Sequence, residues 1–210
     1  MTFSVDPVAA GFVASLSKPG GNVTGLTQGT GVENRAKLLQ LLKEAVPGLS
    51  TVGILYEVPG SHAIADIDSA ARSLGLRPVT VGMQRVDDID AAFASIVRQQ
   101  AGAFVLLPSA MSIGRRQQFA DLGIHHRLPG IANNREYAAA GLPIAFGANL
   151  LDNHRRAAVY VDKILRGAKP ADLPVEQART FEFVINLKTA RALGLVISSS
   201  LLLRADRVIE

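Results

Sequence analysis

The sequence lacks cysteine and tryptophan, and only 5% of its 210 residues are aromatic. Without cysteine, a disulfide framework, a thiolate metal site and a cysteine nucleophile are all excluded. With so few aromatic residues, we expect a core of alanine, leucine, valine and isoleucine, which suits helices packed closely on a parallel sheet. No apolar run approaches the roughly 18 residues that a membrane-spanning helix requires.

Sequence patterns for catalysis and for cofactor binding are missing or incomplete. Neither a His-Glu-x-x-His metal motif nor a nucleotide-binding P-loop occurs, and a Gly-x-Gly-x-x-Gly pattern beginning at Gly29 has Asn34 in place of its third glycine. Ser15 and Lys18 match Ser-x-x-Lys, but the partner motifs of serine acyl enzymes are missing. We therefore expect neither an enzyme nor a bound metal or other cofactor.

Charge gives little indication of a nucleic-acid partner. The net charge is +4, and the 22 basic residues are spread along the chain. The densest pairs, Arg115-Arg116 and Arg155-Arg156, are expected on exposed helix faces. A nucleic-acid surface requires clustered basic residues, preferably with stacking aromatic side chains. Nucleic acid is therefore not an expected partner.

Short apolar runs alternate with longer amphipathic stretches along the chain. Strands are predicted at residues 23–27, 51–56, 79–83, 103–107, 128–132, 143–146 and 181–186. Helices are predicted at about residues 6–17, 32–46, 61–74, 87–97, 112–126, 135–140, 150–166, 186–193 and 201–209. This alternation predicts right-handed βαβ units and a doubly wound, parallel α/β fold.

Helix ends and one irregular stretch refine this prediction. Asp6 precedes Pro7 and is expected to cap the first helix. Asp87 and Asn186 are expected to cap later helices, and Ser199 or Ser200 to cap the terminal one. Residues 168–177 have two prolines and no periodicity, so a surface crossover is expected there.

Polar and aromatic residues follow several of the predicted strands. In open α/β sheets, ligands bind outside the carboxyl ends of the strands. Several of these residues also precede helices, whose free N–H groups favour a carboxylate. Each of them alone suits ordinary helix capping, but together they predict a polar crevice with one or two aromatic walls for a small zwitterion. The candidates are Ser4, Asp6, Tyr56, Ser61, His62, Ser109, Asn133, Asn134, Tyr137 and Asn149.

Three segments resemble the tryptophan/phenylalanine-type family of ABC transporter substrate-binding proteins. They are residues 6–27 (DPVAAGFVASLSKPGGNVTGLT), 38–56 (LLQLLKEAVPGLSTVGILY) and 157–195 (AAVYVDKILRGAKPADLPVEQARTFEFVINLKTARALGL). The resemblance implies a type I periplasmic-binding-protein fold, in which two lobes joined by three crossovers close on a small ligand. It also implies an extracytoplasmic protein that binds an amino acid, aromatic or branched, and presents it to a membrane ABC permease.

The resemblance also implies a division of the chain. Lobe one, incomplete at its N-terminal side, is expected at residues 1–22 and 148–168, lobe two at 23–132 and 178–198, crossover or hinge regions at 133–147 and 169–177, and a C-terminal helix at 199–210. No signal peptide is recognised in the chain as given. The chain is then either part of a longer frame or a truncated protein whose exposed lobe-one helices favour a dimer.

One further departure from the family pattern and two alternative functions remain open. Glu57-Val58-Pro59-Gly60 stands where the family usually has an Asn-Pro loop, which leaves the ligand unassigned. The same fold also serves as the ligand-sensing domain of regulators, and an enzyme on this scaffold is a third class. A DNA-binding domain upstream would indicate a regulator, whereas a secretory or lipoprotein signal would indicate transport.

Overall fold

The computed structural model describes residues 6–28, 32–58 and 62–210, and the chain divides into two compact units. The small unit comprises Met1–Gly31 and Ala148–Phe181, and the large unit comprises Val32–Gly147 and Glu182–Glu210. The chain therefore passes from one unit to the other three times, after residues 31, 147 and 181.

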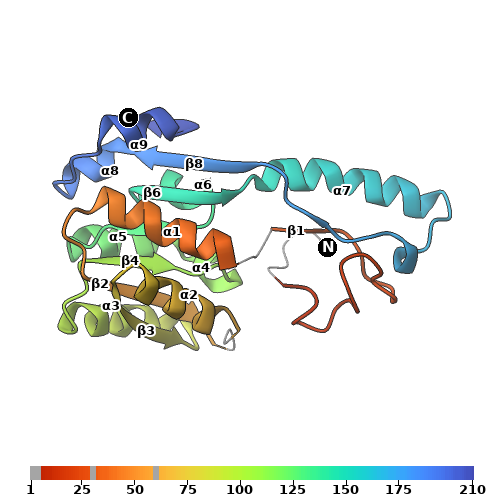
Figure 1. Cartoon of the computed structure of the whole chain (residues 1–210), viewed down its shortest axis with the longest axis horizontal. Helices are drawn as coiled ribbons and strands as arrows, with labels where there is room; N and C mark the ends of the chain where they lie inside the picture. Colours follow the sequence, from red (N-terminus) through yellow and green to blue (C-terminus); the bar gives the residue numbers. More distant parts are fainter. Residues whose placement is uncertain (1–5, 29–31, 59–61) are drawn as a thin grey trace. The chain divides into compact units, whose positions relative to one another are not determined.

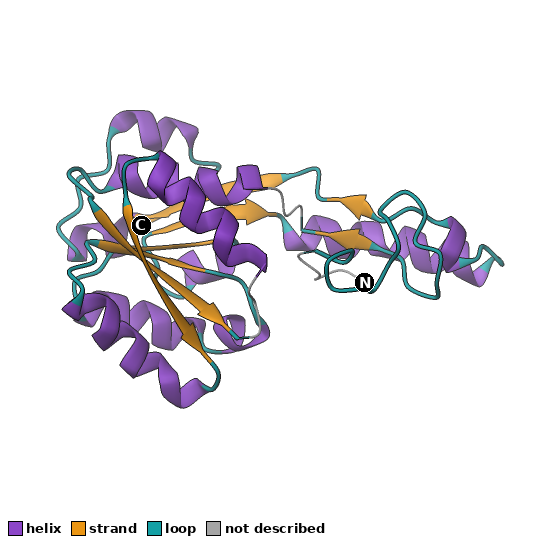
Figure 2. Ribbon diagram, turned by 60° about the horizontal axis from the view of Figure 1, so that its bottom comes forward, coloured by secondary structure: helices purple, strands orange, loops and turns teal. Residues whose placement is uncertain are grey.

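A seven-stranded sheet forms the centre of the large unit within the described residues (Figures 1 and 2). Its strands, in spatial order, are β3 (Arg77–Met83), β2 (Thr51–Glu57), β4 (Ala103–Leu106), β5 (Gly130–Ala132), β6 (Ile144–Ala148), β8 (Phe181–Asn186) and β9 (Arg207–Ile209). Pairing is parallel between β2 and β3, β2 and β4, β4 and β5, β5 and β6, and β8 and β9. The predicted parallel α/β class is confirmed.

Helices connect these strands and lie on both faces of the sheet (Figure 2). They are α1 (Val32–Ala45), α2 (His62–Ser73), the 3₁₀ turn η1 (Val86–Asp88), α3 (Ile89–Arg98), α4 (Ala110–Gly114), α5 (Arg116–His125), α6 (Arg135–Ala139), α8 (Leu187–Ala192) and α9 (Ser199–Arg204). Helix α3 illustrates why they form, since Ile89, Ala92, Phe93 and Ile96 recur at helical spacing and are all buried.

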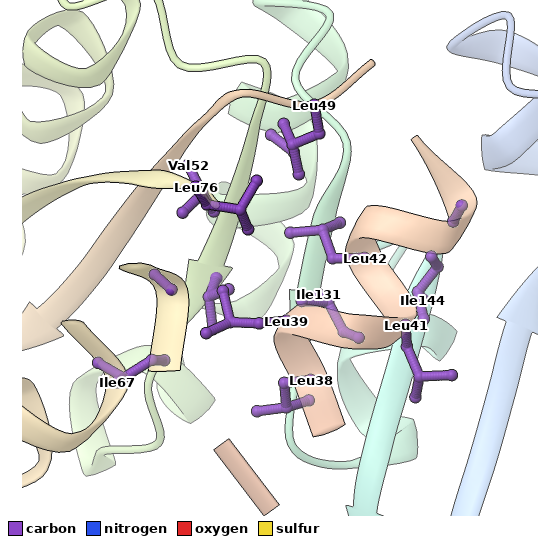
Figure 3. Packing of buried hydrophobic residues seen from close by; sticks show 14 of the residues in the cluster. Leu38, Leu39, Leu41, Leu42, Leu49, Val52, Ile67, Leu76, Ile131 and Ile144 are labelled. Atoms are coloured by element: carbon purple, nitrogen blue, oxygen red, sulfur yellow. The ribbon is translucent and has the colours of Figure 1, made fainter. Parts of the chain in front are cut away.

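Alternate residues of the central strands enter different hydrophobic cores. In β4, Ala103 and Val105 pack in one cluster with α1 and α2, whereas Phe104 and Leu106 pack in the other with α3 and α5. Figure 3 shows the first cluster, where Leu38, Leu39 and Leu42 of α1 lie over the sheet. Both faces are thus buried, as a doubly wound fold requires.

The small unit has little regular structure. Its strands β1 (Leu26–Thr27) and β7 (Glu176–Gln177) pair in parallel, and α7 (Leu150–Leu165) and the 3₁₀ turn η2 (Pro170–Asp172) complete it within the described residues. None of its described residues belongs to the three core clusters. Among the described residues of both units, no helix is both long and apolar enough to cross a membrane.

The unit boundaries differ from those expected. Residues 133–147 hold α6 and most of β6 and lie inside the large unit, whereas 169–177 hold η2 and β7 and lie inside the small unit. Residues 23–28, expected in lobe two, form β1 and its flanks in the small unit. The connections are short because β6 and β8 each continue by one residue into the small unit.

The helix predicted at residues 6–17 is wrong. Residues 7–11 form turns, in which Asp6 Oδ1 accepts hydrogen bonds from the N–H groups of Val8 and Ala9, at 3.2 and 2.9 Å. The predicted apolar face is not buried, since Val8 and Phe12 are exposed. A single amphipathic helix depends on burial of that face, so periodicity alone does not make one here.

Three other helix boundaries need correction. Helix α3 begins after Asp88 rather than Asp87. The helix predicted from residue 112 begins at Ala110, with Ser109 as its cap, and is interrupted at Arg115. Likewise, the predicted terminal helix at 199–210 ends at Arg204, and β9 then pairs with β8.

Substituting Gly147 by alanine is expected to destabilise the protein by about 3 kcal/mol or more. An added Cβ would lie 1.4 Å from the carbonyl oxygen of Asn133, so the backbone of β6 or of the preceding turn must move. Urea unfolding followed by circular dichroism measures the loss. Gly114→Ala is the control, because its Cβ meets nothing within 4 Å and alanine favours the helix. Equal stability of the two variants would contradict this packing.

Candidate functional site

The candidate residues are divided between the two units. Tyr56, Ser109, Asn133, Asn134 and Tyr137 belong to the large unit, and Asp6 and Asn149 to the small unit. Ser4 and Ser61 lie outside the described residues. His62 begins α2, and its side chain is also outside the part that the structure describes.

Three neighbouring strands of the large unit bring candidates to one edge of its sheet. β2, β4 and β5 are adjacent and parallel, so their carboxyl ends meet at the same edge. Tyr56 is the penultimate residue of β2, Ser109 follows β4 and Asn133 follows β5. The sheet topology thus supports the grouping that the sequence predicted for this unit.

Tyr56 is half-buried and lies across the neighbouring strand. It pairs in register with Gly82 of β3, and a Cβ on Gly82 would come within 2.9 Å of the Tyr56 ring. Glycine at this position therefore leaves room for the ring. Next to it, Glu57 Oε2 accepts a hydrogen bond from the Met111 N–H at 3.3 Å and connects the end of β2 to α4. Glu57 was not among the sequence candidates.

Ser109 caps α4 in a reciprocal arrangement. Its hydroxyl accepts from the Ser112 N–H at 2.9 Å, and the Ser109 N–H donates to the Ser112 hydroxyl at 2.9 Å. This is a capping box, a local role that stabilises the first turn of a helix. Ser109 therefore has a structural function here whether or not it also contacts a ligand.

Tyr137 is part of the core and does not form an exposed aromatic wall. It is fully buried, and its hydroxyl lies 2.7 Å from the hydroxyl of Ser112. Burial raises the pKa of the Tyr137 phenol above its ordinary value, and the hydrogen bond with Ser112 opposes that rise. The ring connects α6 to α4 within the second hydrophobic cluster.

In the small unit, the candidate Asn149 caps α7. It lies where the connection after β6 is hydrogen-bonded to the connection before β8. Its side-chain oxygen accepts from the Asp152 N–H, and its own N–H donates to the Thr180 carbonyl, both at 3.0 Å. Asp152 in turn accepts a hydrogen bond from the Thr180 hydroxyl at 2.9 Å. The ends of β6 and β8, which are neighbours in the large sheet, thus remain bonded where they enter the small unit.

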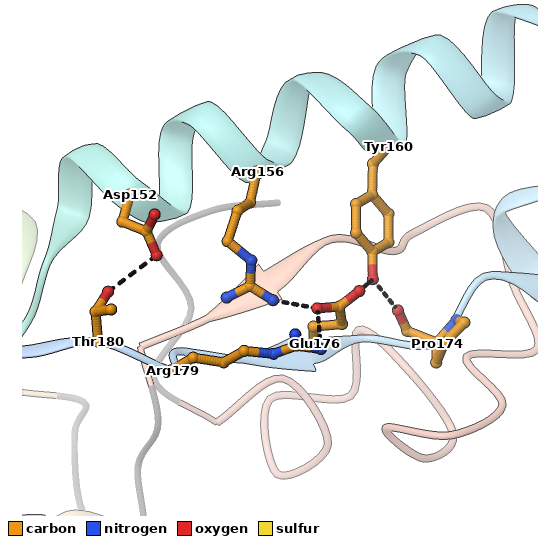
Figure 4. A network of polar contacts seen from close by, with 7 residues as sticks. All are labelled: Asp152, Arg156, Tyr160, Pro174, Glu176, Arg179 and Thr180. Atoms are coloured by element: carbon orange, nitrogen blue, oxygen red, sulfur yellow. Dashed lines mark hydrogen bonds and ion pairs between the residues drawn. The ribbon is translucent and has the colours of Figure 1, made fainter.

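A polar network holds α7 against β7 (Figure 4). Glu176 forms ion pairs with Arg156 and with Arg179, the latter at 3.1 Å. The Tyr160 hydroxyl lies 2.7 Å from the Pro174 carbonyl and 3.1 Å from Glu176 Oε1, so it can donate to either. Sequence reasoning missed this network, because only the Arg156–Tyr160 spacing on one helix face is visible locally.

The network shifts the ionisation of its members. Burial and the hydrogen bond to Glu176 raise the pKa of Tyr160 to about 12. Burial of Glu176 favours its neutral form, but the Tyr160 hydrogen bond and the charge of Arg156 outweigh it and lower the pKa of Glu176. Both shifts favour a neutral phenol beside a charged carboxylate at neutral pH, which is a structural arrangement rather than a catalytic one.

Other surfaces offer no better site. A groove over α3 and α5 is lined by polar residues such as Asp90, Arg115 and His125, but by none of the candidates. Across the described part of the chain, no three His, Asp or Glu side chains are grouped so that they could hold a metal ion. The carboxyl edge of the large sheet is therefore the best candidate site in that unit.

A doubly wound unit with polar residues at its carboxyl edge is typical of a small-molecule binding domain. The family model described as "ABC transporter substrate binding protein" matches residues 1–209, and the chain belongs to this family. This confirms the family that the three sequence segments indicated. The family is one of substrate-binding proteins and not a class of enzymes.

Individual relatives carry ligand names. A tyrosine-binding protein of Clostridioides difficile (strain R20291) is 27% identical over 202 residues, which are 93% of this chain and 56% of that protein. An ABC domain from Streptococcus pneumonia, solved in complex with L-Trp, is 25% identical with a TM-score of 0.89, covering 97% of this chain and 69% of that one. A conserved domain protein from Vibrio cholerae is 25% identical with a TM-score of 0.88, at the same coverage.

The chain spans about half the length of the curated relatives it matches, 56% of one and 53% of another. Since nearly all of this chain matches the L-Trp complex, its folded elements have counterparts there. The reverse does not hold, because part of each relative has no counterpart in this chain.

Glu176→Gln is expected to lower stability by about 1–2 kcal/mol near neutral pH, because the ion pairs with Arg156 and Arg179 are lost. The folded-state pKa of Glu176 is lowered. Its contribution is therefore fully present above the ordinary glutamate pKa of about 4.3 and is lost as the pH falls through the lower folded value. The stability difference between wild type and variant should shrink in acid.

Thermal unfolding of both proteins across this pH range measures the difference. Asp162→Asn is the matched control on α7, the helix that carries Arg156, because its ion pair with Arg166 is highly exposed and contributes little. A difference for Glu176→Gln that stays constant into acid, or one no larger than the control's, would contradict the role of the network.

Proposed function

We propose that this chain is the ligand-binding part of the solute-binding component of an ABC importer, and that its ligand is an amino acid with an aromatic side chain. The observation that carries this proposal is the match of 97% of the chain to a domain solved with L-Trp, at a TM-score of 0.89. The tyrosine-binding relative supports the same ligand class. An aromatic amino acid is a zwitterion with a largely apolar side chain, which fits the candidate set of polar residues and an aromatic ring.

Within the large unit, the ligand contacts are proposed at the carboxyl edge of β2, β4 and β5. Tyr56 supplies a half-buried ring and Glu57 an acidic group, while Ser109 and Asn133 supply uncharged polar groups. An aromatic side chain would pack on the Tyr56 ring, since aromatic pairs are stabilised beyond their buried area.

The small unit is proposed to be an incomplete lobe whose exposed apolar surface is covered by further protein. Several large apolar side chains of the small unit are exposed, including Phe12 at 56% and Leu165 at 82%. Apolar surface of this kind is normally covered by protein. This surface is covered either by further polypeptide of a longer chain or by a second copy of this chain. The greater length of the relatives supports the first. Light scattering distinguishes a monomer from such a dimer.

The partners follow from the family. A substrate-binding protein of an ABC importer delivers its ligand to a membrane permease, and closure on the ligand gives the permease a form to recognise. The proposed location is extracytoplasmic, where such a component meets its ligand.

L-Tryptophan and L-tyrosine are expected to bind in a saturable manner. Because the chain contains no tryptophan, emission excited where its three tyrosines do not absorb comes from L-tryptophan alone, and calorimetry measures L-tyrosine. L-Alanine is the control ligand, since it shares the main-chain groups and lacks the ring. Absence of any binding, or equal affinity for L-alanine, would refute an aromatic ligand.

Tyr56→Leu is expected to weaken L-tryptophan binding about two- to tenfold, through loss of the ring contact. Tyr137→Phe is the matched control, because Tyr137 is fully buried and should affect stability through Ser112 but leave affinity unchanged. The same emission titration measures both. Equal affinities for wild type and Tyr56→Leu would remove Tyr56 from the site.

A further inference from the structure

One turn of the large unit holds buried polar atoms that have no hydrogen-bond partner. Within the described residues, these include both side-chain amide atoms of Asn134 and the Oε2 atom of Glu136. Asn134 is 1% exposed. Both residues lie between the end of β5 and the first turn of α6, at the carboxyl edge of the sheet.

Helix capping does not account for Asn134. Asparagine is the N-cap residue of three helices, α6, α7 and α8, and two of these three asparagines cap in the ordinary way. Asn149 accepts from the Asp152 N–H before α7, and Asn186 accepts from the Thr189 N–H before α8, both at 3.0 Å. Asn134 has an extended backbone before α6, but its side chain makes no such bond. Its amide therefore keeps both donor and acceptor capacity.

Imperfect packing does not account for it either. The large unit has well-formed hydrophobic clusters on both faces of its sheet, and Tyr137, three residues after Asn134, is fully buried in one of them. A buried polar group without a partner costs free energy, and native proteins retain few of them. The buried, unpaired polar groups that a native protein does retain are concentrated at its functional sites.

The carboxylate of Glu136 is held in place on its other side. Glu136 Oε1 lies 3.5 Å from Arg135 Nε, and Arg135 Nη1 lies 3.6 Å from Glu182 Oε1 of β8. The Glu136 side chain is 40% exposed, so the turn is near the surface of the unit. Arg135 thus contacts one oxygen of Glu136 and leaves Oε2 without a partner among the described residues, two residues after the unpaired Asn134 amide.

From this arrangement we infer that the Asn134–Glu136 turn binds the α-ammonium group of the amino-acid ligand. Glu136 Oε2 and Asn134 Oδ1 accept hydrogen bonds from the ammonium group. Asn134 Nδ2 remains free to donate to the α-carboxylate of the same ligand. A charged acceptor suits a cation, and hydrogen bonds to charged groups are the stronger ones. The inference rests on the proposed function. It gives the sequence candidate Asn134 a role and adds Glu136 as a second contact for the ligand's main chain.

The test compares a ligand that has the ammonium with one that lacks it. L-Tryptophan and indole-3-propionate are titrated by their own emission against wild type, Glu136→Gln and Asn134→Leu. The ratio of the two affinities is expected to fall at least tenfold in Glu136→Gln, because only L-tryptophan loses a charged hydrogen bond. Asn134→Leu should lower the ratio as well, and its unliganded melting temperature should be no lower than that of wild type.

Glu182→Gln is the matched control, because it removes the other carboxylate that contacts Arg135 and leaves the Asn134–Glu136 turn intact. An unchanged ratio in folded Glu136→Gln and Asn134→Leu, or the same fall in Glu182→Gln, would overturn the inference while leaving the proposed function standing. Failure of wild type to bind L-tryptophan would instead refute the proposed function, and the inference with it. Circular dichroism confirms folding, and Asn134→Leu serves alone if Glu136→Gln is unfolded.

Discussion

Burial on both faces of a parallel sheet is the constraint on which the large unit depends. Ala103 and Val105 of β4 enter one core while Phe104 and Leu106 enter the other, so a slip by one residue would exchange the two faces. The register is therefore fixed by packing, as is the edge at which β2, β4 and β5 end. Polar residues at that edge are positioned by the core beneath them, which leaves them available for a ligand.

The small unit depends on polar contacts instead. Without a hydrophobic cluster among its described residues, it is held by the ion pairs and hydrogen bonds of Arg156, Tyr160 and Glu176, which join α7 to β7. The Asn149–Thr180 hydrogen bond continues the neighbouring β6 and β8 into this unit. The small unit thus keeps its two neighbouring chain connections bonded by polar contacts, and the chain as a whole belongs to the substrate-binding protein family.

Local patterns in the sequence predicted most strands, because an apolar run that is buried on both faces is visible in the residues themselves. The strand at 181–186 coincides with β8, and Asn186 caps α8 as expected. Tertiary contacts decide the rest. The periodicity at residues 6–17 does not form a helix, since Val8 and Phe12 remain exposed, and β9 forms through its pairing with β8. The partners of Glu176 depend on the folded chain and have no sequence signal. Asn134 was a sequence candidate, but only the folded chain shows that its amide is unpaired among the described residues.

The central claim is that the carboxyl edge of the large sheet binds an aromatic amino acid. A crystal structure of the chain with L-tryptophan tests it most directly. The account predicts the ligand at the ends of β2, β4 and β5, with its ring beside Tyr56 and its ammonium within hydrogen-bond distance of Glu136. A ligand bound elsewhere, for example in the groove over α3 and α5, would contradict it.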